Sequence, residues 1–190
     1  MKRIPQDNRR AGFSLMEIIV AVSILSILAA TLALRAGGMI DKGKNGKVIQ
    51  LISALKTACE MHHADTGSFA REYSGYAPKH RKLSAKQTQT GWDGPYLEAP
   101  LTHKQNPYNG STHLYNSVTA NSWLTGFDVD GDGTDDVTSQ GNMLWMSNVP
   151  AAAAESINDS FDAGIGGNWS ATGRVRYNES NKHLYVLLYY

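Results

Sequence analysis

The sequence is short of cysteine. It contains one, Cys59, in 190 residues, and a single cysteine excludes an intrachain disulfide. Cys59 lies among apolar residues at helical spacing, where it is expected to act as a small core side chain. A C-terminal half without disulfides requires some other means of stabilisation.

Catalytic signatures are also missing. The chain has no nucleophile elbow, no phosphate-binding glycine loop and no paired-cysteine motif, and its six histidines lack zinc spacing. Residues 1–12 carry four of the 18 basic residues and one of the 17 acidic residues, which leaves a remainder of 14 basic and 16 acidic residues. A mildly acidic body offers no electrostatic footprint for nucleic acid. We therefore expect neither an enzyme nor a nucleic-acid-binding protein.

A long apolar run is present instead. From Phe13 to Leu34 the only formal charge is Glu17. As a helix this stretch would be about 33 Å long, enough to cross a bilayer core of about 30 Å. Lys2, Arg3, Arg9 and Arg10 precede it, and a basic flank keeps that end of a span in the cytoplasm. The pattern predicts a single-pass membrane helix over residues 13–35 with the rest of the chain outside.

Glu17 stands out because a carboxylate inside an apolar span costs roughly 2.5–3.5 kcal/mol on insertion scales. One interpretation places it near the membrane edge, where it reaches water; another gives it a charged partner. A secretory signal peptide is the competing interpretation of the whole run, with Ala29–Ala33 as a fair cleavage site. The span is longer than the apolar region of about 7–15 residues that such a peptide needs.

The segment Gly12-Phe13-Ser14-Leu15-Met16-Glu17, between the basic leader and the apolar run, resembles the type IV prepilin signal. Type IV pilins and the pseudopilins of type II secretion share this signal. The resemblance implies that a prepilin peptidase cuts between Gly12 and Phe13, which removes leader 1–12. It also implies N-methylation of Phe13. In an assembled fibre Glu17 would neutralise the Phe13 amine of an adjacent subunit.

Beyond the span, residues 36–67 are predicted to form an amphipathic helix outside the membrane, ending near Gly67. Glycines 37, 38, 43 and 46 allow either a break or one continuous helix. Residues 68–190 suggest a globular β domain, with strands at 142–146 and a hairpin of 174–178 with 183–190. Turns and a short strand are expected over 91–97, and a further strand at 113–115. The fold class is α+β: a pilin-like long N-terminal helix packed on a small C-terminal antiparallel sheet.

Residues 128–136 form an acidic, glycine-bent loop with five aspartates. Calcium takes six to eight hard oxygen ligands, which alternating aspartates supply. The predicted ligands are carboxylates and one carbonyl: Asp128, Asp130, Asp132, Asp136 and the Thr134 carbonyl. Asp135 is left out of the set. Position 12 of an EF-hand would be Ser139 instead of glutamate, so the loop is not an EF-hand. The alternative is a solvated acidic turn.

Two segments resemble the major pseudopilin of type II secretion: Gly94-Pro95-Tyr96-Leu97 with the turns that follow, and Gly133–Val137 within a calcium loop. The resemblance implies a structural subunit of a pseudopilus that drives export of folded proteins. The implied partners are copies of itself, prepilin peptidase, minor pseudopilins, the inner-membrane secretion platform and membrane lipid. The implied location is the bacterial inner membrane, with the C-terminal domain periplasmic.

Two other functions stay open: a surface type IV pilin for adhesion, motility or DNA uptake, and a membrane-anchored calcium-binding module that does not polymerise. A basic cluster, Lys79-His80-Arg81-Lys82 with Lys86, is either a solvated loop face or a site for an anionic partner.

Overall fold

The structure is a computed structural model that describes residues 14–73, 78–121 and 123–190, except for the side chains of residues 32–40 and 78. The predicted leader 1–12 and the cleavage residues Gly12 and Phe13 lie outside the described residues. Internal contacts divide the chain into two compact units, Met1–Ile40 and Asp41–Tyr190. Each unit is considered separately, and the second unit is called the body.

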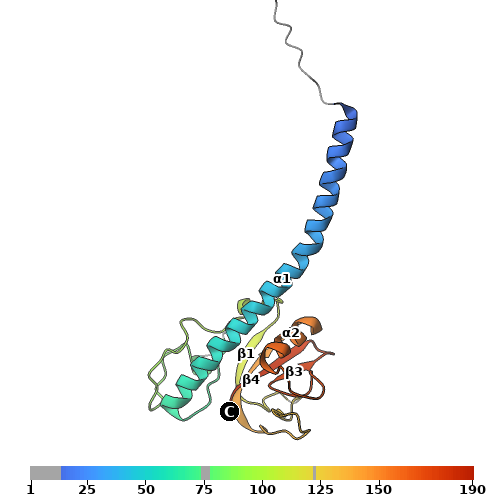
Figure 1. The fold of residues 1–190 in the computed structure, drawn as a ribbon. Helices are drawn as coiled ribbons and strands as arrows, with labels where there is room; N and C mark the ends of the chain where they lie inside the picture. Colours follow the sequence, from blue (N-terminus) through green and yellow to red (C-terminus); the bar gives the residue numbers. More distant parts are fainter. Residues whose placement is uncertain (1–13, 74–77, 122) are drawn as a thin grey trace, which may run out of the picture. The chain divides into compact units, whose positions relative to one another are not determined.

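Helix α1 extends without interruption from Leu15 to Thr66 (Figure 1). The helix is therefore continuous through the glycines at 37–46, and the alternative of a break there is wrong. The predicted end is confirmed, because Gly67 has φ +65° and its N–H donates to the carbonyl of His63 at 2.8 Å. A left-handed glycine directly after the last helical residue is a common C-terminal cap.

Four antiparallel strands form one sheet in the order β1-β2-β4-β3, with β1 at Thr112–Ser117, β2 at Gln140–Met146, β3 at Val175–Asn178 and β4 at His183–Tyr189. The predicted strands near 113–115, 142–146 and in the C-terminal hairpin are confirmed. Helix α2, Ala151–Phe161, follows Pro150. Two short 3₁₀ helices, η1 at Pro78–His80 and η2 at His103–Gln105, lie in the segment before β1.

The short strand expected within 91–97 is not formed. Tyr96 and Leu97 instead both donate their N–H groups to the carbonyl of Leu83, at 2.7 and 3.1 Å. Pro95 has no N–H to give to a strand ladder. This segment is irregular and packs Tyr96 and Leu97 against the core.

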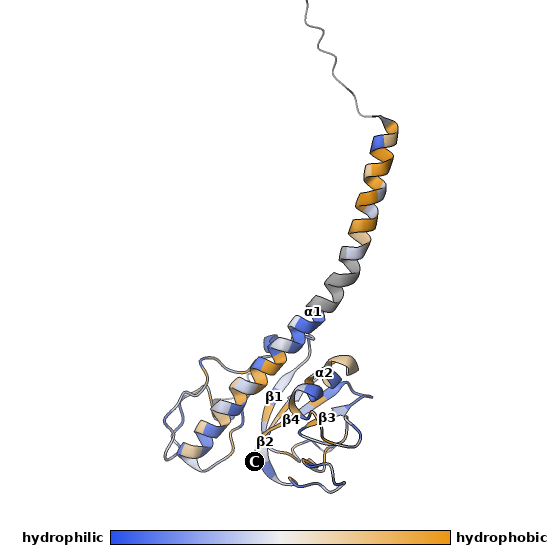
Figure 2. Cartoon of the chain, in the orientation of Figure 1, coloured by the Kyte–Doolittle hydropathy of each residue, from blue (hydrophilic) through white to orange (hydrophobic). Residues whose placement is uncertain are grey.

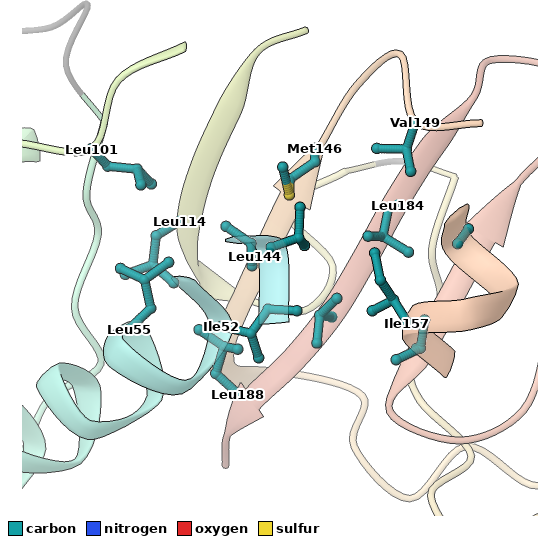
Figure 3. Close-up of a cluster of buried hydrophobic side chains, with 14 of the residues drawn as sticks. Ile52, Leu55, Leu101, Leu114, Leu144, Met146, Val149, Ile157, Leu184 and Leu188 are labelled. Atoms are coloured by element: carbon teal, nitrogen blue, oxygen red, sulfur yellow. The ribbon is translucent and has the colours of Figure 1, made fainter. Parts of the chain in front are cut away.

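One face of the sheet carries the main core. Ile52 and Leu55 of α1, both essentially inaccessible to solvent, point at Leu114, Leu144 and Leu188 of the sheet (Figure 3). Ile157 of α2 joins the same cluster beside β3. The predicted amphipathic face of the helix is therefore confirmed, since Val48, Ala58 and Cys59 are buried with it.

The opposite face is covered by the long connection between β1 and β2. Leu124, Phe127 and Val137 from that connection pack on Met143, Tyr185 and Leu187. This packing fixes both ends of the acidic loop, because Phe127 and Val137 also form a backbone bridge. The loop is thereby held on a buried base that includes Asp128, while residues 129–136 are at least partly exposed.

No helix segment within the described part of the chain meets the length and apolarity needed to cross a membrane. The predicted span, 13–35, includes positions outside the described residues.

Candidate assembly helix and acidic loop

The first part of α1 exposes its apolar side chains on all sides. Leu15 is 78 % exposed and Ile27 is 66 % exposed, and the large apolar residues between them are exposed as well. Figure 2 shows that hydrophobic residues predominate in this part of the helix. Side chains at every angle around the helix are apolar, so no single face is set apart for packing. A helix that is apolar all round needs an apolar environment from other molecules.

Glu17 has a local partner that sequence reasoning missed. Its Oε2 accepts the N–H of Ser14 at 2.9 Å, and Ser14 Oγ accepts the N–H of Glu17 at 3.2 Å. This is a reciprocal capping box, in which each side chain satisfies one backbone donor at the helix start. A serine three residues before a glutamate is the sequence signal that could have revealed it. The carboxylate thus has a structural role in a single chain.

Three of the predicted metal ligands come together in the acidic loop. Oxygens of Asp128, Asp130 and Asp136 all lie within 4.8 Å of one another, and Asp128 is only 4 % exposed. No other cluster of three potential ligand residues of this kind occurs among the described residues. Three carboxylate oxygens at this spacing are a donor set for a hard divalent cation.

Glycines shape the loop around Asp128. Its Oδ1 accepts the N–H of Gly131 at 2.7 Å and its Oδ2 accepts the N–H of Gly133 at 2.9 Å. Both glycines have positive φ, +82° and +93°, which a side chain would strain. Asp136 accepts the N–H of Val129 at 2.7 Å, which closes the loop across its two ends. The backbone therefore orients the carboxylates before any cation binds.

Asp132 lies outside the cluster of three. Its Oδ1 accepts the N–H of Thr134 at 2.8 Å, and the side chain is exposed. Asp135 faces away from the cluster, as its exclusion from the ligand set implied. Asp135 forms an ion pair with Arg176 of β3 at 3.3 Å and accepts the hydroxyl of Thr125 at 2.8 Å. That pair attaches the loop to the edge strand, and nothing in the sequence marks it.

Residues 162–175 also hold the acidic loop in place. The N–H of Gly173 donates to the carbonyl of Asp128 at 2.7 Å, and Asp162 Oδ2 accepts the N–H of Val175 at 2.8 Å. Asp162 is 5 % exposed, and this burial raises the pKa of its carboxyl group. Gly173 has no space for a Cβ, because Asp162 Oδ2 would lie 2.3 Å from it. The segment 162–175 therefore positions Asp128 through backbone contacts.

Comparison with known proteins agrees with the N-terminal pattern. Residues 7–33 match the model of the prokaryotic N-terminal methylation motif. Type II secretion system core protein G of Aeromonas hydrophila is 30% identical over 105 residues, 54% of this chain and 73% of that protein. Core protein G of Pseudomonas aeruginosa is 29% identical over 136 residues, 67% of this chain and 95% of that protein.

Core protein G of Klebsiella michiganensis is 29% identical over 109 residues, which cover 50% of this chain and 77% of that protein. No solved structure matches the chain significantly.

A long helix that starts in a methylation motif and ends on a small antiparallel sheet defines a type IV pilin-like protein. Within that class, the chain belongs to the family of the type II secretion system core protein G, the major pseudopilins. The resemblance noted in the sequence is therefore confirmed. The family is structural in character, which agrees with the expectation of a non-enzyme.

Proposed function

We propose that this protein is a subunit of a type II secretion pseudopilus, a fibre that drives export of folded proteins. The observation that carries the proposal is the first part of α1, whose apolar side chains are exposed all round and whose one charge is Glu17. Family membership supports the same assignment. Prepilin peptidase, the secretion platform and minor pseudopilins are its partners under this proposal.

Exposed apolar area explains why such a helix assembles. Burying apolar surface is worth about 25 cal/mol per Å². Lipid surrounds the apolar side chains of this helix while the subunit is in the inner membrane with its body in the periplasm. In the fibre, the helices of neighbouring subunits bury these side chains. Glu17 then needs a counter-charge, because an unpaired buried carboxylate is costly. The N-methylated amine of Phe13, freed by cleavage after Gly12, supplies that charge from an adjacent subunit.

For the acidic loop we propose calcium, held by Asp128, Asp130 and Asp136. Their spacing supports it, and so does the near-complete burial of Asp128. Carbonyls, such as that of Thr134, and water complete a shell of six to eight oxygens, and Asp132 stays outside it. The ion would neutralise carboxylates that otherwise repel one another and would stabilise the body in place of a disulfide.

Variants at Glu17 test the fibre and separate its two roles. Glu17→Gln keeps a hydrogen-bond acceptor for the Ser14 N–H but removes the charge, whereas Ser14→Ala removes half of the capping box and keeps the charge. We expect Glu17→Gln to be cleaved normally and to assemble no fibres, and Ser14→Ala to assemble them. The measurement is the amount of fibre sheared from cells that express the full chain, with cleavage followed by mass.

Normal fibre yield from Glu17→Gln would show that capping, and not charge, is the role of this residue. Mass spectrometry of the mature wild-type chain gives a second check. The proposal requires an N-terminus at Phe13 carrying one added methyl group, and a chain beginning at any other residue contradicts it.

A further inference from the structure

A basic hollow lies beside the C-terminal end of α1. It is lined by Phe69, Arg71, Lys79, His80, Lys82 and Asn116. Arg71 is oriented by a hydrogen bond from its Nε to Asn116 Oδ1 at 3.2 Å. Desolvation, and then the positive charges of Lys79 and Arg71, lower the pKa of His80. Several positive charges therefore converge on one concave surface.

Arg71, Lys79 and Lys82 form no ion pair with an acidic side chain in the described part of the chain. Among the described residues, no carboxylate oxygen lies within 4.0 Å of the side-chain nitrogens of Arg71, Lys79 or Lys82. The nearest acid in sequence, Glu72, is buried and turned inward, where it accepts the N–H of Leu83 at 2.9 Å and the hydroxyl of Ser84 at 2.6 Å. An uncompensated basic hollow favours an anionic occupant from outside the chain.

The hollow and the acidic loop lie at opposite edges of the sheet. Arg71 bonds to Asn116 of β1, and Glu72 pairs with Leu114 of β1. Asp135 of the acidic loop pairs with Arg176 of β3. In the strand order β1-β2-β4-β3 the outer strands are β1 and β3, about 14 Å apart at the usual spacing between strands. A positive surface beside β1 and a negative surface beside β3 therefore lie on the two sides of one body.

We propose that the basic hollow of one subunit binds the acidic loop of a second copy of this chain, in a head-to-tail contact between bodies. The inference rests on the proposed fibre and names one of its lateral interfaces. Because the two surfaces differ and lie on opposite edges, each copy keeps one surface free after pairing. Such a heterologous contact propagates into a filament instead of closing as a dimer.

A bound calcium ion leaves the loop acidic. The loop has five aspartates; a divalent cation and the Arg176 pair together offset three of those charges, which leaves two. Asp132 is exposed and outside the cluster of three carboxylates, so its charge is available to the partner. Lys79 and Lys82 of the neighbour face it in this arrangement, and calcium binding and subunit contact are compatible.

Charge reversal tests the contact in the full chain. We expect Lys79→Glu with Lys82→Glu to lower the yield of sheared fibres at least about tenfold, because like charges across an interface oppose association. Lys86→Glu reverses one charge in the same segment at a position that does not line the hollow, so its yield should stay at the wild-type level, whereas Lys79→Glu alone should lower it. Adding Asp132→Lys to the double variant should restore fibres in part.

Cysteine pairs test the geometry independently of fibre yield. Cells expressing Lys79→Cys together with Asp132→Cys should give disulfide-linked dimers in their membranes, whereas each variant alone should give none. Both changes in one chain should give a ladder of multimers. The native Cys59 is buried and stays out of this reaction.

The inference is overturned if Lys79→Cys cross-links to itself, if no cross-link forms, or if the charge reversal leaves fibres intact. Loss of fibres in Glu17→Gln with no effect of charge reversal would keep the proposed function and reject this interface. If the wild-type chain makes no fibres and the ladder is also absent, both proposals fail.

Discussion

Helix α1 contains two segments that meet different surroundings within the same continuous element. In the first, Leu25 is 63 % exposed and its apolar neighbours lie all around the helix. In the second, from Val48 to Cys59, the apolar residues share one face and are buried against the sheet. The polar residues of the second segment, such as Lys56 and Glu60, face solvent.

The two segments differ in what buries their apolar side chains. The second segment is held by its own chain, since its apolar face has a partner surface in the body. The first segment has no such partner among the described residues of its unit, and under the proposed function lipid or other subunits surround it. Under the proposed function, the same helix contributes to a core within the chain and to a core between chains.

The largest expected effect separates the two segments directly. Leu55→Ala should destabilise the body by about 2–5 kcal/mol, because it opens a cavity in a packed core. Leu25→Ala makes the same chemical change at an exposed site, and its effect on the body should stay within about 0.5 kcal/mol. Denaturant unfolding of the full chain in detergent, followed by tryptophan fluorescence, measures both. Equal losses would remove the distinction between the segments.

Calcium removal should come next in size. Chelation is expected to lower the unfolding free energy of the body by about 2.7 kcal/mol if the ion was present at 100 times its dissociation constant. Asp128→Asn should abolish the response to calcium. Asp132→Asn, outside the cluster of three, should retain it. A thermal midpoint unchanged by chelation in the wild-type chain would argue for a solvated acidic turn.

Acidification should weaken the body end of α1 through His62. This side chain is fully buried, its Nδ1–H donates to the Ser68 carbonyl at 3.0 Å, and burial lowers its pKa below 6.5. Between 6.5 and the lowered folded pKa the unfolded state binds more protons, so stability decreases as the pH falls through that window. We expect His62→Gln to flatten this part of the pH profile of stability.

The matched control for that profile is His63→Gln, since His63 is adjacent and partly exposed. It should leave the slope between pH 7 and about 5 close to that of the wild type. If His63→Gln flattens the pH profile of stability and His62→Gln does not, the assignment of this profile to His62 is wrong.

The smallest effect is expected on the solvent face of the second segment. Lys56 and Glu60 form an ion pair at 3.8 Å with both side chains more than 40 % exposed. Glu60→Ala should cost no more than about 0.5 kcal/mol, because exposed helical pairs contribute little and are screened by salt. The same unfolding experiment at low and high salt measures it. A loss as large as that of Leu55→Ala would mean that packing does not dominate this helix.

Much of the fold was readable from the sequence because periodicity reports local structure. The spacing of Val48, Ile52 and Leu55 predicted a buried helical face, and Gly67 predicted its end. The apolar run of 184–190 indicated a strand that is either central or covers the long helix, and β4 is an inner strand of the sheet. The strand expected within 91–97 did not form, since Pro95 cannot donate and Leu83 offered its carbonyl from a distant part of the chain.

The sequence by itself determined the elements whose signals are local: the apolar run with Glu17, the amphipathic helix and an aspartate-rich loop that favours a cation. Only the tertiary structure decided which aspartates converge, because Arg176 draws Asp135 away and Gly173 anchors Asp128. It also decided that the basic hollow and the acidic loop lie on opposite edges. Strand order sets that placement, and strand order depends on long-range pairing that no short stretch of residues specifies.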